Sequence, residues 1–217
     1  MDLSNKENLV KIVTEIVKRA INEHKDRLVP IGISNRHIHL SKKDLETLFG
    51  KRYTLTKIKD LVQPGQFAAK ETVKIIGPKG NFEKVRILGP VRDTTQVEVS
   101  LADGFKIGIK VPIRESGKIE NTPGIILEGP KGKVTKNNGV IAALRHIHIP
   151  PEIAKAYGLQ DKQMVDVETE GIRKTVFGNV LVRVSDRYSL EMHIDMDEAN
   201  SSDIKNGDKV RILKNKE

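Results

Sequence analysis

The feature that most constrains the fold is a strand-like unit that occurs twice. The first copy is Ile31–Leu40 (IGISNRHIHL) and the second is Val140–Ile149 (VIAALRHIHI). Both end in Arg-His-Ile-His followed by an aliphatic residue, and a helix start follows each copy. The two copies start at residues 31 and 140, and a unit repeated at this separation predicts two related barrels rather than one irregular domain.

Short strands are expected through most of the remaining chain. Alternating apolar residues are separated by clusters of Gly, Pro and Asn, a pattern typical of barrels and sandwiches. Two short helices are expected at Lys42–Phe49, where Ser41 can act as a cap, and at Pro150–Tyr157, which Gly158 can end. The predicted fold class is mainly β with a few short helices.

The N-terminal segment Glu7–Lys25 has apolar residues at helical spacing, which predicts an amphipathic helix. The helix either packs on its own domain or serves as a detachable docking helix, and the pattern leaves both open. The predicted apolar face consists of Leu9, Val13, Ile16, Val17, Ala20 and Ile21.

Composition narrows the classes of partner. The absence of cysteine excludes disulfides, thiolate zinc fingers and a cysteine nucleophile. The net charge of +9 favours nucleic acid, anionic lipid or a phosphorylated small molecule. Five Phe, three Tyr and no Trp are few for stacking on single strands, so nucleic acid is not expected. The polar start does not resemble a secretory signal, and no apolar run reaches the roughly 18 residues that span a bilayer, so we expect a cytoplasmic chain.

Four of the six histidines lie in the two His-X-His pairs. Residues i and i+2 of a strand point to the same face, so His37 with His39, and His146 with His148, can each bind one ion. Neutral imidazole suits zinc, and a catalytic zinc keeps three protein ligands. One such pair is often only two polar residues on a strand face, but two identical pairs favour metal binding.

Each pair needs a third ligand. We expect His193 for one pair and Glu98 for the other, because an inward-facing acid in a strand is costly without a partner. Arg92 precedes the Glu98 strand and could bind an anion with its planar fork. Rival acidic ligands, in a run that is more typical of a solvated turn, are Asp195, Asp197 and Glu198.

Several motifs together resemble the PduL-type phosphotransacylases, also called phosphate propanoyltransferases. The resemblance runs in order from about residue 30 to 200. Its motifs are Ser34–Ser41 (SNRHIHLS), Gln63–Gln66 (QPGQ), Gly77–Gly80 (GPKG), Gln96–Ser100 (QVEVS), Thr122–Gly124 (TPG), Arg145–His148 (RHIH) and Leu190–Asp195 (LEMHID).

The resemblance implies two β-barrels, each capped by a helix, with a two-zinc site between them. It implies a discontinuous first barrel formed by residues 26–35 plus 144–217, and a second barrel formed by residues 36–143. Residues 1–25 precede both barrels as the N-terminal amphipathic helix, and in this family such an extension often targets the enzyme to a bacterial microcompartment.

Site residues carried over from the family form four groups. His37, His39 and Glu98 would hold one Zn²⁺, and His146, His148 and His193 the other, although another divalent metal could replace zinc. Arg92 would bind phosphate as the catalytic arginine. The expected contacts to coenzyme A are Ile33, Ser34, Asn35, Lys79, Arg86 and Asn200.

The implied activity interconverts a short-chain acyl-CoA plus phosphate with acyl phosphate plus coenzyme A. Propanoyl-CoA is the expected substrate, with acetyl-CoA as a second, in propanediol degradation. The expected partners are these substrates, microcompartment shell or core proteins and a second copy in a homodimer, but neither nucleic acid nor a membrane. Two other classes stay open: a two-metal hydrolase or thioesterase, and a non-enzymatic zinc-binding barrel module.

Overall fold

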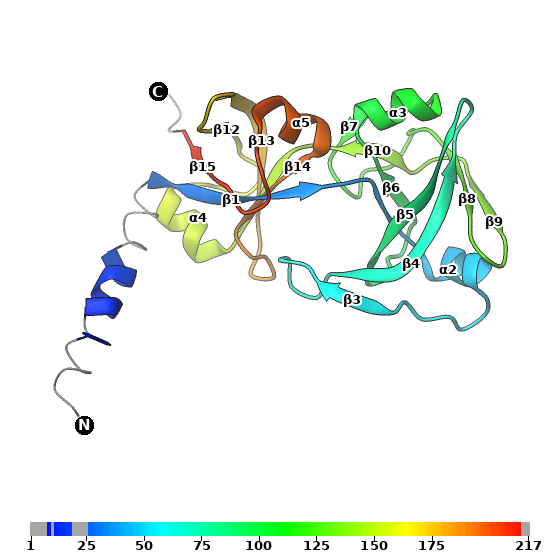
Figure 1. Cartoon of the computed structure of the whole chain (residues 1–217), viewed down its shortest axis with the longest axis horizontal. Helices are drawn as coiled ribbons and strands as arrows, with labels where there is room; N and C mark the ends of the chain where they lie inside the picture. The colour runs from blue at the N-terminus through cyan, green and yellow to red at the C-terminus, as the bar shows by residue number, and fades with distance from the viewer. Residues whose placement is uncertain (1–7, 10, 19–25, 214–217) are drawn as a thin grey trace.

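The computed structural model describes residues 8–9, 11–18 and 26–213, and here the chain forms a closed barrel beside a curled open sheet (Figure 1). The barrel order is β1-β14-β11-β13-β12-β15. One barrel strand precedes the sheet in sequence and five follow it. The strands are β1 (Leu28–Ser34), β11 (His146–Ile149), β12 (Met164–Glu168), β13 (Val176–Val184), β14 (Glu191–Asp195) and β15 (Lys209–Ile212).

The second sheet has the order β7-β10-β6-β2-β5-β4-β8-β9, with β3 paired to β4 off this path. The expected second barrel is thus an open curled sheet, because no ladder joins its end strands β7 and β9. The mainly β fold class is confirmed. The strands are β2 (His37–His39), β3 (Lys57–Asp60), β4 (Phe67–Ile76), β5 (Asn81–Gly89), β6 (Gln96–Glu98), β7 (Ile113–Arg114), β8 (Ile125–Glu128), β9 (Lys133–Lys136) and β10 (Val140–Ala143).

The barrel and the sheet each bury their own hydrophobic core. Ile147 and Val182 belong to the barrel core, and Ile38 and Ile87 to the sheet core. The chain passes from barrel to sheet after β1 and returns before β11. The division into domains 26–35 plus 144–217 and 36–143 stays a prediction, because strand membership alone does not define independent folding units.

Two short helices lie beside each sheet: α2 (Lys42–Phe49) and α3 (Leu101–Ile107) at the open sheet, α4 (Pro151–Tyr157) and α5 (Met196–Ser202) at the barrel (Figure 1). The predicted caps of α2 and α4 are confirmed. Ser41 accepts a hydrogen bond from the backbone N–H of Asp44, and Gly158 ends α4 in the left-handed region at φ 66°. Helices α2 and α4 therefore each follow a His-X-His strand in the chain, β2 and β11 respectively.

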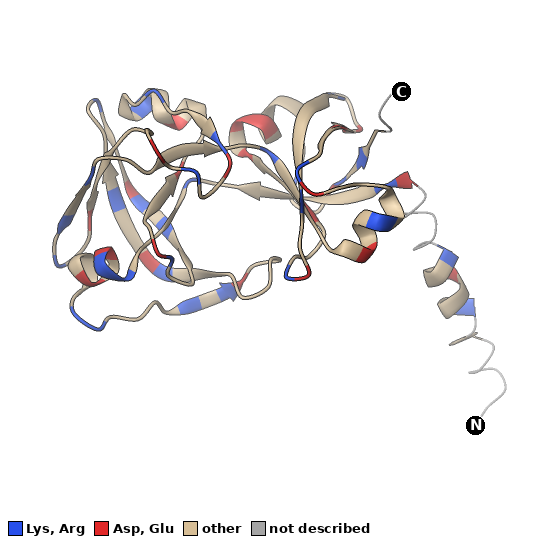
Figure 2. Ribbon diagram, turned by 180° about the vertical axis from the view of Figure 1, so that it is seen from behind, with Lys and Arg blue, Asp and Glu red and all other residues tan. Residues whose placement is uncertain are grey.

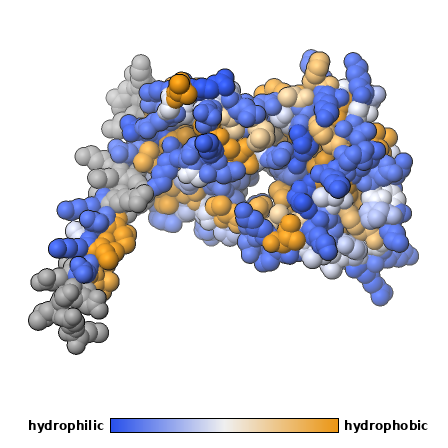
Figure 3. All heavy atoms as spheres, in the orientation of Figure 1, coloured by the Kyte–Doolittle hydropathy of each residue, from blue (hydrophilic) through white to orange (hydrophobic). Residues whose placement is uncertain are grey.

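The predicted N-terminal helix lies partly outside the described residues. Residues 8–9 and 11–18 are helical, whereas the expected face residues Ala20 and Ile21 are not described. Four large apolar side chains of this helix, Ile12, Val13, Ile16 and Val17, are 49–61% exposed. Figure 3 shows them as an apolar stripe on a helix that projects from the main body.

Candidate two-metal active site

Strand register brings the first predicted ligand group together. The short strand β2 pairs antiparallel with β6, and this places His37 opposite Glu98. His39 is two residues along the same face, and its Nε2 lies 3.9 Å from the Glu98 carboxylate, against 3.5 Å for Nε2 of His37. Potential ligand atoms of His37, His39 and Glu98 all lie within 4.8 Å of one another. All three side chains are nearly buried.

The second group repeats this register in the closed barrel. Antiparallel pairing of β11 with β14 places His146 opposite His193. Nε2 of His146 lies 3.0 Å from Nε2 of His148, and the ligand atoms of all three histidines lie within 4.8 Å of one another. The two groups are therefore equivalent positions of a repeated unit, in which Glu98 and His193 correspond.

The equivalence extends to one further position in each group. His39 is opposite Gln96, and His148 is opposite Glu191. Gln96 donates a 2.6 Å hydrogen bond to Glu98, and Glu191 forms a 2.6 Å hydrogen bond with Nε2 of His193. In each unit the residue two positions before the third ligand holds that ligand by a hydrogen bond. The amide of Gln96 holds the carboxylate of Glu98, and the carboxylate of Glu191 holds the imidazole of His193.

Burial keeps three of the histidines neutral. Burial, with the nearby charges of other histidines and arginines, lowers the pKa of His39 to about 3, of His148 to about 2 and of His146 to about 4. Since imidazole binds metal only in its neutral form, these residues are suited to metal at neutral pH. Burial alone would raise the pKa of Glu98, but His37 beside it holds that pKa well below the usual value.

The residues present fit two metal ions. Nδ1 of His37 and Nδ1 of His146 each lie 2.8 Å from a backbone carbonyl oxygen, of Asn35 and Leu144. A proton on Nδ1 that bonds this oxygen leaves the lone pair on Nε2, which faces the other ligands. Three ligands a group leave a position for substrate. That these groups bind metal stays a prediction.

Both groups line one cavity of about 850 Å³ between the barrel and the sheet. Arg92, which follows β5, and Arg183, on β13, also line it. Burial lowers the pKa of Arg92, and the positive charge of Arg183 lowers it further. Arg92 and Arg183 therefore offer two positively charged groups to an anionic substrate, within a lining that also carries acidic side chains such as Glu98.

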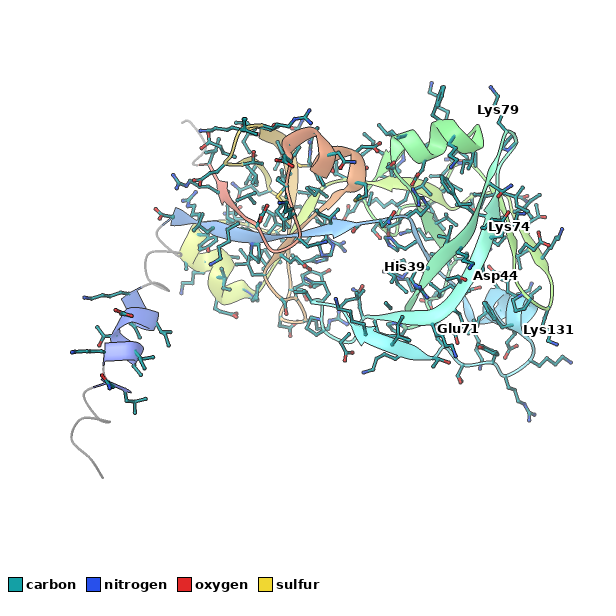
Figure 4. The ribbon with its side chains drawn as sticks, in the orientation of Figure 1. His39, Asp44, Glu71, Lys74, Lys79 and Lys131 are labelled. Carbon is teal, nitrogen blue, oxygen red and sulfur yellow. The ribbon has the colours of Figure 1, made fainter. Side chains whose placement is uncertain are left out.

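The expected coenzyme A contacts divide into two sets. Ile33, Ser34, Asn35 and Arg86 line the cavity. Lys79 and Asn200 are not among its lining residues. Lys79 lies in the β4–β5 turn against Gly108, and Figure 4 shows it at the tip of the sheet, away from His39.

Asn200 lies exposed on α5, where its backbone oxygen accepts a hydrogen bond from Arg173. The rival acids of this run have structural contacts instead of a metal-like cluster. Asp195 caps α5 by accepting from the N–H of Glu198, and Asp197 accepts from the N–H of Ala102.

A family model described as phosphate propanoyltransferase matches residues 30–205. The chain belongs to the phosphate propanoyltransferase family. This confirms the resemblance stated above and the expected enzyme class, a transferase.

Individual members of the phosphate propanoyltransferase family are similar over most of their length. The phosphate propanoyltransferase of Thermotoga maritima is 54% identical over 84% of this chain and 88% of its own. The enzyme of Rhodopseudomonas palustris is 54% identical over 86% of this chain and 82% of its own. The enzyme of Rhodobacter capsulatus is 48% identical over 94% of this chain and 96% of its own. No described helix of this family member is long and apolar enough to cross a membrane.

Four site residues were missed by the sequence reasoning: Gln63, Arg183, Tyr188 and Glu191 all line the cavity. Tyr188 packs edge-on against His148, with ring centroids 4.3 Å apart. Gln63 and Glu191 stand inside two of the motifs that carry the resemblance, which is the one signal that could have found them. Their roles depend on contacts between segments far apart in sequence.

Proposed function

We propose that this family member transfers a short acyl group between coenzyme A and inorganic phosphate at a site with two metal ions. The observation that supports this most is that two three-ligand groups and two arginines line one cavity. An acyl-CoA and a phosphate must meet in one place, and both are anionic. When bound, the metals supply Lewis-acid chemistry that stabilises a thiolate and polarises the carbonyl or neutralises phosphate charge.

The protein residues bind and orient the two substrates. Arg92 binds phosphate, because its guanidinium offers paired donors and stays charged despite burial. Ile33, Ser34 and Asn35, which line the cavity, contact coenzyme A, and Arg86 contacts its phosphates. Lys79 and Asn200 stay proposed contacts for its distal part. Phosphate attacks the thioester carbonyl directly, and coenzyme A leaves as the thiolate.

Direct transfer requires no acylated side chain. Both substrates are held in a ternary complex, so the rate of the step comes from proximity and from charge stabilisation. Incubation with acyl-labelled propanoyl-CoA, followed by denaturation and mass spectrometry, should leave the chain at its native mass. An acyl adduct on the protein would contradict direct transfer.

The test of the function is release of coenzyme A from propanoyl-CoA and acetyl-CoA, with and without phosphate, before and after chelation, alongside metal analysis. We expect about two metals a chain and release that needs both phosphate and metal. Propanoyl-CoA should be preferred, although one methylene is worth only about 1–3 kcal/mol. Release without phosphate would indicate a thioesterase or hydrolase, and metal without release would favour the binding module.

We also propose that the N-terminal helix docks the cytoplasmic enzyme to shell proteins of a bacterial microcompartment for propanediol degradation. The exposed apolar side chains of residues 11–18 support docking over packing on the described body. Deletion of residues 1–25 should leave activity intact and abolish binding to purified shell protein. Loss of folding would show a packing role. We expect a homodimer, which sedimentation equilibrium of the full chain tests.

A further inference from the structure

One hairpin of the open sheet contacts the closed barrel through the buried side chain of Gln63. The loop after β3 carries Gln63, which is 2% exposed. Its Nε2 donates to the backbone oxygen of Ser189 and to Oε2 of Glu191, both at 3.1 Å. Its Oε1 accepts from the N–H of Ser189 at 3.3 Å. The hairpin therefore has a specific dock on the strand that carries His193.

The same carboxylate oxygen that accepts from Gln63 also contacts a candidate metal ligand. Oε2 of Glu191 lies 2.6 Å from Nε2 of His193. Engagement of one ring nitrogen fixes the rotation of the imidazole and leaves the other nitrogen available for metal. Glycine at position 32 makes room for this arrangement, because a Cβ on Gly32 would lie 2.6 Å from Oε1 of Glu191.

The equivalent position in the open sheet shows what is particular to this contact. Gln96 holds Glu98 and is itself held by Ser116 and by the N–H of Gly117, all within the sheet. Glu191 in the barrel is held instead by Gln63, from the other sheet. The support of one ligand group is therefore local, whereas that of the other depends on the hairpin.

The hairpin also forms part of the cavity wall. Lys59, Asp60, Leu61, Val62 and Gln63 all line it. Its strand β3 is exposed along its whole length and pairs only with β4, and Figure 2 shows basic residues along it. β4 also pairs with β5, at Phe67 and Ala68, so β3 is an edge strand of the larger sheet with one neighbouring strand. The loop after β3 lies beyond this pairing, and the hydrogen bonds of Gln63 hold it against the barrel.

We propose that Gln63 and Glu191 are positioning residues that couple docking of the β3–β4 hairpin to the metal-binding geometry of His193. The proposal deepens the proposed function and rests on it, since it requires a metal at His146, His148 and His193. Linkage makes the effect reciprocal: a docked hairpin tightens metal binding, and bound metal tightens docking to the same extent. Metal-loaded protein then keeps the hairpin docked against the cavity for a larger fraction of the time than metal-free protein does.

The first experiment measures release of zinc from loaded protein to a chromogenic chelator. Release should show two phases, and a His148→Ala variant identifies the phase of the three-histidine group. In Gln63→Met, which keeps the side-chain length without hydrogen bonds, that phase should be about 10-fold faster. The phase of the group at His37 should be unchanged and serves as an internal control.

The second experiment reads the hairpin itself. Trypsin cleaves after Lys57 and Lys59, which are exposed on β3. Wild-type protein should be cleaved there at least about fivefold more slowly with zinc than after chelation, the lower end of typical coupling. In Gln63→Met the two rates should be equal. A control variant, Lys162→Gln, removes a different contact between barrel and sheet, that with Glu115, and should behave as wild type.

The outcomes separate this proposal from the proposed function. Wild-type protein that binds no metal at the three-histidine group would overturn both. Two bound metals, with unchanged release and unchanged trypsin ratio in Gln63→Met, would overturn only the coupling. Circular dichroism tests whether Gln63→Met folds. If it does not, Glu191→Gln takes its place, because it keeps the shape of the side chain and loses the negative charge that Gln63 and His193 contact. The same release phase should then accelerate by about 10-fold or more, and wild-type release would overturn the proposal.

Discussion

Replacing Gly32 with alanine should prevent binding of one of the two proposed metal ions without disrupting the fold. Gly32 lies on β1 directly beside His193 of β14 in the parallel ladder. An added Cβ would lie 2.6 Å from Oε1 and 2.8 Å from Cδ of Glu191, and 3.1 Å from Cδ2 of His193. The backbone of Gly32 is not in the left-handed region, so the cost comes from space and not from backbone strain.

The magnitude follows from what Glu191 must give up. The carboxylate can move only by leaving its hydrogen bonds with Gln63 and His193. Hydrogen bonds to a charged group contribute about 1.5–3 kcal/mol each, so full loss costs up to about 6 kcal/mol. Glu191 lines the cavity, and water there recovers part of this. We expect about 3 kcal/mol, or a melting temperature about 6–12 °C lower.

The assay combines thermal unfolding with metal analysis after dialysis. Gly32→Ala should keep a cooperative transition and retain about one metal instead of two. Gly178→Ala is the matched control, since it adds the same methyl to a barrel strand and meets only Asp166 at 3.3 Å. It should change stability by no more than about 0.5 kcal/mol. Wild-type stability together with two metals in Gly32→Ala would refute the argument that Glu191 is fixed in place.

Three further changes test other parts of the structure. Arg92→Lys should raise the KM for phosphate at least about 10-fold with little change in the KM for acyl-CoA, because an ammonium group lacks the paired donors of a guanidinium group. Steady-state kinetics with each substrate varied in turn measures both constants. An equal rise in both KM values would contradict a specific role of Arg92 in phosphate binding. Asp44→Ala should cost about 2–3 kcal/mol in urea unfolding, because the buried carboxylate accepts from Thr95 and from a lysine, and a loss under 0.5 kcal/mol would count against this. Hydrogen bonds from Lys118 and Lys162 lower the pKa of Glu115 to about 2, below the unfolded value of about 4.3. The stabilisation by ionised Glu115 is therefore complete above about pH 4.3 and is lost as the pH falls towards 2. Glu115→Gln should lower the free energy of unfolding by about 1 kcal/mol at pH 6, because the partner lysines are exposed. This loss should become smaller as the pH falls from about 4.3 towards 2. A deficit that does not change with pH would contradict the ion-pair origin.

Much of the site could be predicted from local sequence because strand geometry is local. The period of two residues was enough to place His37 with His39 and His146 with His148 on common faces. The repeat itself predicted two related units, and the structure has a barrel and a sheet in which the two units have the same register.

What could not be predicted depends on contacts between distant segments. Which pair takes Glu98 and which takes His193 is decided by strand pairing, and the resemblance alone assigned it beforehand. Gln63 and Glu191 are 128 positions apart, and no local pattern relates them. Lys79 is basic and follows a strand, as a phosphate-binding lysine would, but only the fold shows that its turn lies away from the cavity.

The order of strands in the closed barrel has a consequence for synthesis on the ribosome. β1 is made first among the barrel strands, yet its neighbours β14 and β15 are made last. The open sheet can pair all its strands while β1 still has an unpaired edge, which is prone to associate with other chains. A chain that stops early therefore yields no smaller working enzyme. It leaves β1 without its barrel neighbours, and cellular quality control can recognise such an exposed strand.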